Sequence, residues 1–170
     1  DPTTAPRALT FARFRSHIER RLDRLPALRR RLVEVPLGID HPCWVEDESF
    51  RLSNHVRHRS LGGTGTTDEV IVLAGELAAV HLDRDRPLWE YVFIDGLADG
   101  SAAVVLKMHH CTVDGVTGME VLAELLDLTP EPPRRRRQAP WSPEPYPDLA
   151  DVVLDATRSR LGDPLRAVHA

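Results

Sequence analysis

The chain has 170 residues, of which 42% are apolar and 28% are charged, a length and composition typical of one globular domain with a modest core. Its net charge is −4, but residues 1–60 carry 12 Lys and Arg against 8 Asp and Glu, whereas residues 61–133 carry 3 against 13. Basic and acidic residues are interleaved, which excludes the broad basic surface that nucleic-acid binding usually needs.

The cysteines and the apolar runs indicate a cytoplasmic protein. Cys43 and Cys111 are too few for a framework of several disulfides, so a reducing compartment is expected. The longest apolar run, residues 70–80, is interrupted by a glycine and a glutamate and is shorter than the roughly 20 residues that cross a bilayer. Because the chain begins at Asp1 rather than Met, the sequence leaves open whether a segment precedes it.

The first predicted element is an amphipathic helix. Apolar residues recur every three or four positions from Phe11 to Leu25, and Pro26 then interrupts the pattern. The polar face of this helix is rich in arginine. Such a helix usually packs on the core of its own domain, and attachment to a lipid surface is the alternative.

An extended segment and a second helix are expected next. Residues 51–61 have no helical period and end in a glycine-rich loop, which favours an extended conformation. Thr66 and Glu69 have the spacing of a capping box, in which each side chain accepts a hydrogen bond from the other residue's backbone. The pattern predicts a helix that begins there and runs to about Leu82.

Two strands joined by a hairpin loop follow. Residues 89–94 are rich in aromatic and β-branched side chains, and two Asp-Gly pairs mark turns before a second apolar run over residues 102–108. That second run is apolar at nearly every position, as expected of a strand covered on both faces, and it ends at a histidine pair. A third helix is predicted from about residue 116 to residue 128.

The C-terminal part separates into a linker and a further helix. Residues 130–147 hold seven of the 14 prolines together with the run Arg134–Arg137, so this segment cannot sustain a helix or a paired strand. The arginine run is usually a solvated part of a linker, and binding to anionic head groups or acidic partners is the alternative. We therefore expect one subdomain over residues 1–129, a linker over residues 130–147 and a helix within residues 148–170.

The residues best suited to chemistry stand at the end of the second predicted strand. Adjacent side chains on a strand point to opposite sides, so only one of His109 and His110 should enter a given cleft, while the other packs behind it. An imidazole with a pKa of about 6.5 is largely neutral at neutral pH and can take a proton from a hydroxyl group. Asp114 and Gly115 then turn the chain into the next helix.

Other kinds of site fit these residues less well. Adjacent ligands on a strand diverge, so His109, His110 and Asp114 make a poor metal site, and no metal is predicted. His55 and His58 are more often packing or surface residues than half of a zinc site. Cys111 suggests a Cys-His nucleophile, but strand alternation would turn its side chain away from His110, and a small buried thiol is expected.

The residues from His109 to Gly115 resemble the His-His-x-x-x-Asp-Gly motif of the CoA-dependent acyltransferase superfamily, which includes chloramphenicol acetyltransferase-like enzymes and the condensation domains of peptide synthetases. Three further segments resemble the wax ester synthase/diacylglycerol acyltransferase family, in the family's order and within roughly residues 9–130. These segments are Phe50–His58, Asp83–Trp89 with its Pro-Leu-Trp end, and His110–Met119.

This resemblance implies an α/β fold, in which the chain forms one subdomain of a chloramphenicol acetyltransferase-like enzyme with a mixed sheet and flanking helices. In that family the active site lies in a channel between two subdomains, so a C-terminal subdomain is expected as a partner of this chain.

The resemblance also assigns roles to residues. His109, His110 and Asp114 form the catalytic motif, in which His110 is the base and Asp114 holds the loop through an ion pair with an arginine. The residues assigned to the substrate side are Pro87, Leu88, Trp89 and Gly115. Trp89 in an apolar strand is more often simply a core residue.

The implied activity is transfer of a fatty acyl group from acyl-CoA to diacylglycerol or a long-chain alcohol, with acyl-CoA as a substrate and no other cofactor. A carrier-protein-dependent condensation domain and a non-catalytic relative are the alternatives, and the Pro-Leu-Trp segment favours the lipid enzyme. Peripheral association with a membrane or with lipid inclusions is expected.

Overall fold

A computed structural model describes residues 9–36, 41–112, 121, 123–125, 141–142 and 149–162. The chain divides into two compact units. Unit 1 takes residues 1–28, 51–83 and 88–141, and unit 2 takes residues 29–50, 84–87 and 142–170.

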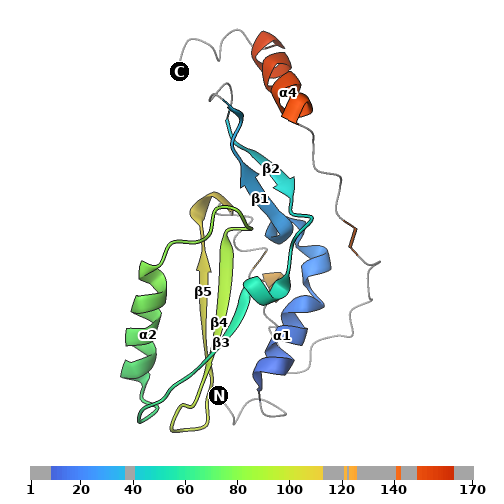
Figure 1. Cartoon of the computed structure of the whole chain (residues 1–170). Helices are drawn as coiled ribbons and strands as arrows, with labels where there is room; N and C mark the ends of the chain where they lie inside the picture. The colour runs from blue at the N-terminus through green and yellow to red at the C-terminus, as the bar shows by residue number, and fades with distance from the viewer. Residues whose placement is uncertain are drawn as a thin grey trace. The chain divides into compact units, whose positions relative to one another are not determined.

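Unit 1 is built on a mixed three-stranded sheet (Figure 1). Its strands are β3 (Val56–Ser60), β4 (Trp89–Asp95) and β5 (Ala103–Met108), in the order β3-β4-β5. β3 runs parallel to β4, and β4 and β5 form an antiparallel hairpin. Both hairpin strands begin and end within one residue of their predicted bounds, and the predicted mixed α/β class is confirmed. The extended segment expected over residues 51–61 is β3, preceded by a 3₁₀ turn at Leu52–Asn54.

Helix α1 (Phe11–Glu19) covers one face of this sheet with aromatic contacts (Figure 1). The ring of Phe14 lies 5.7 Å from that of Tyr91 and 5.5 Å from that of Phe93, measured between centroids. Alternate residues of a strand share a face, so Trp89, Tyr91 and Phe93 all point toward α1. Strand β4 is almost fully buried and forms the centre of the core.

The first helix ends earlier than its apolar period predicts. After Glu19 the chain continues as two 3₁₀ turns, Leu22–Arg24 and Pro26–Arg29. Leu25 has φ −124° and ψ 62°, outside the helical region, because a residue that precedes proline is disfavoured there. The predicted arginine-rich face is also partly buried, since Arg21 is only 7% exposed and donates to the Glu124 carbonyl oxygen at 2.7 Å.

Helix α2 (Thr67–Ala79) lies on the other face of the sheet (Figure 1) and begins with only half of the predicted capping box. The Thr66 hydroxyl accepts from the Glu69 backbone N–H at 3.3 Å, as predicted. The Glu69 carboxylate instead accepts from the backbone N–H groups of Thr64 and Gly65, at 2.9 and 3.0 Å, and these bonds lower its pKa. Gly65 has φ +72°, and a Cβ there would lie 2.5 Å from the carbonyl oxygen of Gly96, so only glycine fits this loop.

Unit 2 contains an antiparallel hairpin that the sequence analysis did not predict. Its strands are β1 (Arg30–Val33) and β2 (Cys43–Glu46), and the unit also includes helix α4 (Leu149–Gly162). Both strands have only four residues and are mostly half-exposed, so neither shows a clear alternation of apolar and polar residues.

Helix α4 lies within the segment 148–170 where a helix was predicted. The predicted linker lies almost wholly outside the described residues, as does most of the helix predicted over 116–128, of which residues 121 and 123–125 are described as helical. The domain boundaries therefore stay predictions. No helix within the described ranges is long and apolar enough to span a membrane.

Candidate active site

The histidine pair lies just beyond the end of β5, at the start of a tight turn. β5 ends at Met108, and a 3₁₀ turn covers His110–Thr112. The backbone N–H of His109 donates to the Leu88 carbonyl oxygen at 2.9 Å, which extends the β4–β5 ladder by one bond. The Thr112 N–H donates to the His109 carbonyl oxygen at 3.0 Å. One main-chain bond thus ties the turn to Leu88, and the other closes the turn itself.

The position of this turn corrects two expectations. Because the strand ends before the histidines, strand alternation does not place them, and both are exposed rather than divided between a cleft and the core. His109 therefore does not pack behind the strand as predicted. Cys111, expected to be a small buried thiol, is exposed on the same turn.

The two histidine rings differ in what they bind. Nδ1 of His109 accepts from the Cys111 backbone N–H at 3.2 Å, so the proton of the neutral ring must sit on Nε2. No hydrogen bond joins the His110 ring to any other residue in the described part of the chain. His110 thus presents an exposed imidazole whose nitrogens are not engaged by those residues.

The other predicted site residues fall into two groups. Asp114 and Gly115 lie outside the described residues, so the ion pair expected of Asp114 stays a prediction. Pro87, Leu88 and Trp89 are all buried, with Trp89 only 1% exposed. The Trp89 indole N–H donates to the Leu28 carbonyl oxygen at 2.6 Å, a contact typical of a core residue. Their contact with substrate also stays a prediction.

His55 and His58 have separate partners rather than a shared ligand. The His55 ring stacks on Trp89 at 4.7 Å, and its Nδ1 donates to the Trp89 carbonyl oxygen at 2.8 Å. Nε2 of His58 lies 2.7 Å from a carboxylate oxygen of Asp95. The Ser60 hydroxyl and then His58 lower the pKa of Asp95 by hydrogen bonding to its charged form. Within the described residues, no group of three or more His, Cys, Asp or Glu could hold a metal ion.

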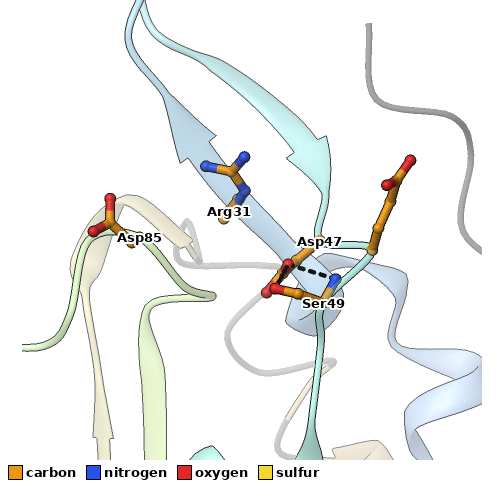
Figure 2. A pocket seen from close by; sticks show the side chains of 5 residues that line it. Arg31, Asp47, Ser49 and Asp85 are labelled. Atoms are coloured by element: carbon orange, nitrogen blue, oxygen red, sulfur yellow. Dashed lines mark hydrogen bonds between the residues drawn. The ribbon is translucent and has the colours of Figure 1, made fainter.

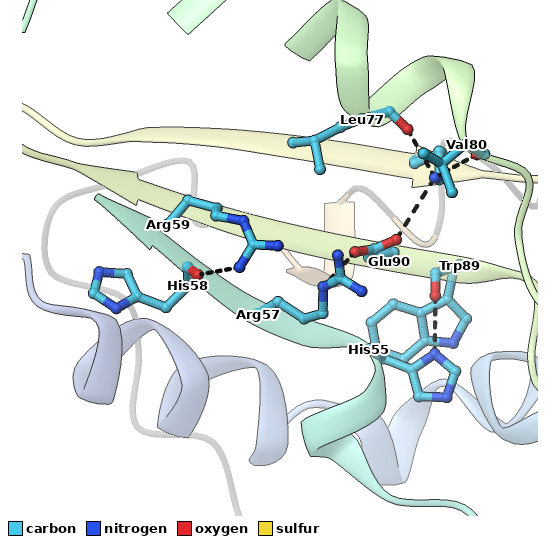
Figure 3. Close-up of polar contacts among 9 residues, drawn as sticks. His55, Arg57, His58, Arg59, Leu77, Val80, Trp89 and Glu90 are labelled. Atoms are coloured by element: carbon cyan, nitrogen blue, oxygen red, sulfur yellow. Dashed lines mark hydrogen bonds and ion pairs between the residues drawn. The ribbon is translucent and has the colours of Figure 1, made fainter. Parts of the chain in front are cut away.

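A charged network that the sequence analysis missed supports the end of β5 (Figure 3). The Lys107 ammonium donates to the carbonyl oxygens of Leu77 and Val80, at 2.9 and 2.8 Å, at the C-terminal end of α2. It also lies 3.6 Å from the carboxylate of Glu90, which pairs with the Arg57 guanidinium at 2.8 Å. Glu90 and Lys107 are each the one charged residue within an otherwise apolar run. In the sequence, that pattern could have indicated that the two charges are paired.

Unit 2 contains a polar pocket of about 440 Å³ (Figure 2). Its lining residues are Arg31, Asp47, Glu48, Ser49 and Asp85. The Asp47 carboxylate accepts from the backbone N–H and the hydroxyl of Ser49, at 3.0 and 2.7 Å. None of the predicted site residues lines this pocket.

Comparison with known proteins decides the family. The model of the wax ester synthase/diacylglycerol acyltransferase catalytic domain matches residues 1–170. The chain belongs to this family. As a wax ester synthase/diacylglycerol acyltransferase domain, it shares the fold of an enzyme class that moves acyl groups, in agreement with the motif at the end of β5.

Similar proteins and a similar solved structure support the same family assignment. Two putative diacylglycerol O-acyltransferases of Mycobacterium tuberculosis are 39% identical over 78% of the chain and 38% identical over 98% of it. A solved wax ester synthase/diacylglycerol acyltransferase from Marinobacter aquaeolei VT8 matches 68% of the chain with a TM-score of 0.53 and 30% identity. The chain spans only 27%, 33% and 29% of these three proteins, respectively.

Proposed function

We propose that the protein to which this chain belongs transfers a fatty acyl group from acyl-CoA to the hydroxyl of diacylglycerol or of a long-chain alcohol. Membership of the family supports this reaction class, and the names of the relatives support diacylglycerol and fatty alcohols as acceptors. No other cofactor is needed, because the thioester of acyl-CoA already carries an activated acyl group.

His110 is the general base in this proposal, and the observation that carries it is the contrast between the two rings. A base must have a ring nitrogen with an available lone pair and must be reachable by the acceptor hydroxyl. Nδ1 of His109 is occupied by the Cys111 N–H, whereas the exposed His110 ring makes no hydrogen bond to the described residues. Exposure on a turn at a strand end also gives a substrate access that a buried histidine would lack.

A single proton acceptor, His110, is sufficient for all the chemical steps. His110 removes the proton from the acceptor hydroxyl as its oxygen attacks the thioester carbonyl carbon, which forms a C–O bond and an oxyanion. The oxyanion collapses, the C–S bond breaks, and the imidazolium of His110 returns its proton to the leaving CoA sulfur. The products are an ester and free CoA, and the base is regenerated.

A second subdomain completes the proposed site. The named relatives are about three to four times as long as the part that this chain matches. A reaction that must keep water from the thioester needs an enclosed channel, and we place its second wall in a C-terminal subdomain of the kind the family carries. Peripheral association with a membrane or with lipid inclusions fits water-insoluble acceptors and belongs to the same proposal.

The test compares His110→Ala with His109→Ala in the complete protein. His110→Ala should lower kcat by roughly 10²-fold or more, a barrier increase of about 2.7 kcal/mol, with little change in acyl-CoA affinity. His109→Ala should keep kcat within about tenfold, because its loss removes one hydrogen bond of the turn rather than the base.

Thiol release from palmitoyl-CoA, with diacylglycerol and with hexadecanol as acceptor, measures both rates. Each rate is normalised to folded protein. An active His110→Ala enzyme would contradict the proposal, as would equal losses of kcat for the two variants.

A further inference from the structure

The pocket of unit 2 is predominantly acidic (Figure 2). Its described lining residues all belong to that unit, and they include three carboxylates and one guanidinium, which gives this lining a formal charge of −2. The volume of about 440 Å³ is within the range of small-molecule sites, roughly 300–1,000 Å³. None of the described lining side chains is apolar, so the pocket suits a small polar cation rather than a fatty acyl chain.

Asp47 is the most firmly held of these carboxylates. The residue is only 4% exposed. Its backbone N–H donates to the Arg29 carbonyl oxygen at 2.9 Å, and its carbonyl oxygen accepts from the Phe50 N–H at 3.0 Å. One carboxylate oxygen, Oδ1, accepts from the backbone N–H and the hydroxyl of Ser49. The position and the orientation of this carboxylate are thus fixed before any ligand binds.

The other carboxylate oxygen of Asp47 remains available. Oδ2 makes no hydrogen bond or ion pair with the residues that the structure describes. It is also not among the side-chain atoms that are sealed from solvent without a partner, so a ligand in the pocket can reach it. A largely buried carboxylate is stabilised most by a positively charged donor, whereas Ser49 supplies only neutral donors, and these go to Oδ1.

The remaining negative charge of the pocket is spread out rather than gathered at one point. Glu48 and Asp85 are both exposed and line the same pocket. A metal ion needs its oxygen ligands around one point, and these carboxylates do not form such a group among the described residues. Arg84 and Arg86 flank Asp85 in the chain, but they are exposed and are not among the described lining residues. Separated carboxylates in one pocket match a ligand with separated positive charges.

We propose that this pocket binds a linear organic polyamine, with one ammonium group on Oδ2 of Asp47 and another at Glu48 or Asp85. An ammonium group has three N–H donors, and its hydrogen bonds to carboxylates are strengthened by charge. The flexible chain of a polyamine lets its ammonium groups reach carboxylates that one metal ion cannot bridge. Arg31 weakens the attraction but leaves the described lining negative. This site goes beyond acyl transfer, since unit 2 contains neither histidine of the motif.

Calorimetric titration of the complete protein with spermidine tests the proposal. We expect one binding site per protein with a Kd below about 1 mM. Butylamine carries a single ammonium group and should bind at least about tenfold more weakly, because one charge-assisted contact is lost. Magnesium chloride should displace spermidine no better than sodium chloride does at equal ionic strength.

Three variants locate the site. Asp47→Asn keeps the shape of the side chain and an oxygen for the Ser49 donors but removes the charge, so the affinity for spermidine should fall by about tenfold or more. Asp85→Asn changes an exposed side chain and should lower the affinity by about threefold or more, which keeps the test valid if Asp47→Asn fails to fold. Glu76→Gln is the control, because Glu76 is exposed on α2 in unit 1, and the affinity should stay within about twofold.

Several results would overturn the inference. These are a complete protein that does not bind spermidine, equal affinities for spermidine and butylamine, and affinities that Asp85→Asn and a folded Asp47→Asn leave unchanged. Displacement of spermidine by magnesium at equal ionic strength would show a metal site instead. Because every readout is binding rather than turnover, failure of this inference leaves the proposed acyl transfer intact, and failure of acyl transfer leaves the polyamine site intact.

Discussion

The chemistry of the histidine pair depends on single hydrogen bonds. Adjacent residues of the same type acquire different properties because a backbone N–H occupies a nitrogen of His109, while no described residue bonds to the His110 ring. The same turn holds a hydroxyl without a described partner at Thr112. Because the His110 ring is exposed and no described residue bonds to it, its nitrogens are accessible and make it a candidate for contact with a substrate.

Trp89 provides a test of whether the Pro-Leu-Trp segment contacts substrate or supports the core. Trp89→Phe removes the indole N–H and leaves the buried Leu28 carbonyl without that bond, and it also reduces the volume of the side chain. We expect the free energy of unfolding to fall by about 2–4 kcal/mol. Chemical denaturation of the protein measures this change.

Trp44 is the matched control for that prediction. It is 37% exposed on β2, so Trp44→Phe should change the free energy of unfolding by less than about 0.5 kcal/mol. If Trp89→Phe leaves the free energy of unfolding unchanged and instead lowers kcat/KM for acyl-CoA, Trp89 contacts the substrate and the core interpretation is wrong.

At the scale of secondary-structure elements, β5 and α2 are joined by the half-buried ammonium group of Lys107. Strand β5 is the edge of the described sheet, and its residues are mostly half-exposed rather than covered on both faces as predicted. Lys107 compensates by bonding to the last carbonyl oxygens of α2 and by lying close to Glu90 (Figure 3). A cation at the C-terminal end of a helix also interacts favourably with the helix dipole.

Removing this charge should loosen the end of α2. Lys107→Met keeps most of the aliphatic stem but leaves two carbonyl oxygens unbound and Glu90 without one of its two cations. We expect a loss of about 1–3 kcal/mol in the free energy of unfolding and faster amide hydrogen exchange in the last turn of α2.

Arg59 on β3 serves as the comparison for Lys107. Its guanidinium is exposed and, among the described residues, bonds only to the His58 carbonyl oxygen, at 3.4 Å, so Arg59→Met should alter stability by less than about 0.5 kcal/mol. Unchanged exchange in α2 after Lys107→Met would show that the helix is held by its apolar contacts alone.

At the scale of the whole molecule, the proposed reaction needs more than residues 1–170. The chain matches about a third or less of the length of the three relatives named above. A cleft with one wall leaves the substrate exposed to water and poorly oriented. Activity is therefore proposed for the complete protein rather than for this part of it.

A direct comparison tests that proposal. Residues 1–170 alone should bind acyl-CoA weakly and release thiol from palmitoyl-CoA at a small fraction of the rate of the complete protein. Supplying the remaining part of the protein should restore the rate, because it completes the channel. Full turnover by residues 1–170, with either hexadecanol or diacylglycerol, would refute the need for a second subdomain.

The sequence by itself determined the elements whose signals are local. Strands β4 and β5 were predicted from β-branched and aromatic runs between turn residues, and α2 from its apolar period and the Thr66 cap. The histidine motif, together with the three further segments that narrowed the superfamily, likewise identified the family without any knowledge of the fold. Periodicity, capping and turn formation depend on neighbours within a few residues, so they can be read from the chain directly.

Only the tertiary structure decided features that depend on distant partners. The parallel pairing of Val56 with Tyr91, the burial of Arg21 against the carbonyl of Glu124 and the contact of Lys107 with α2 each join residues that are far apart in the sequence. The end of β5 at Met108 exposed the two histidines that strand alternation would have divided. A side chain's exposure and its hydrogen-bond partners are set by whatever packs beside it, and that neighbour is chosen by the fold as a whole.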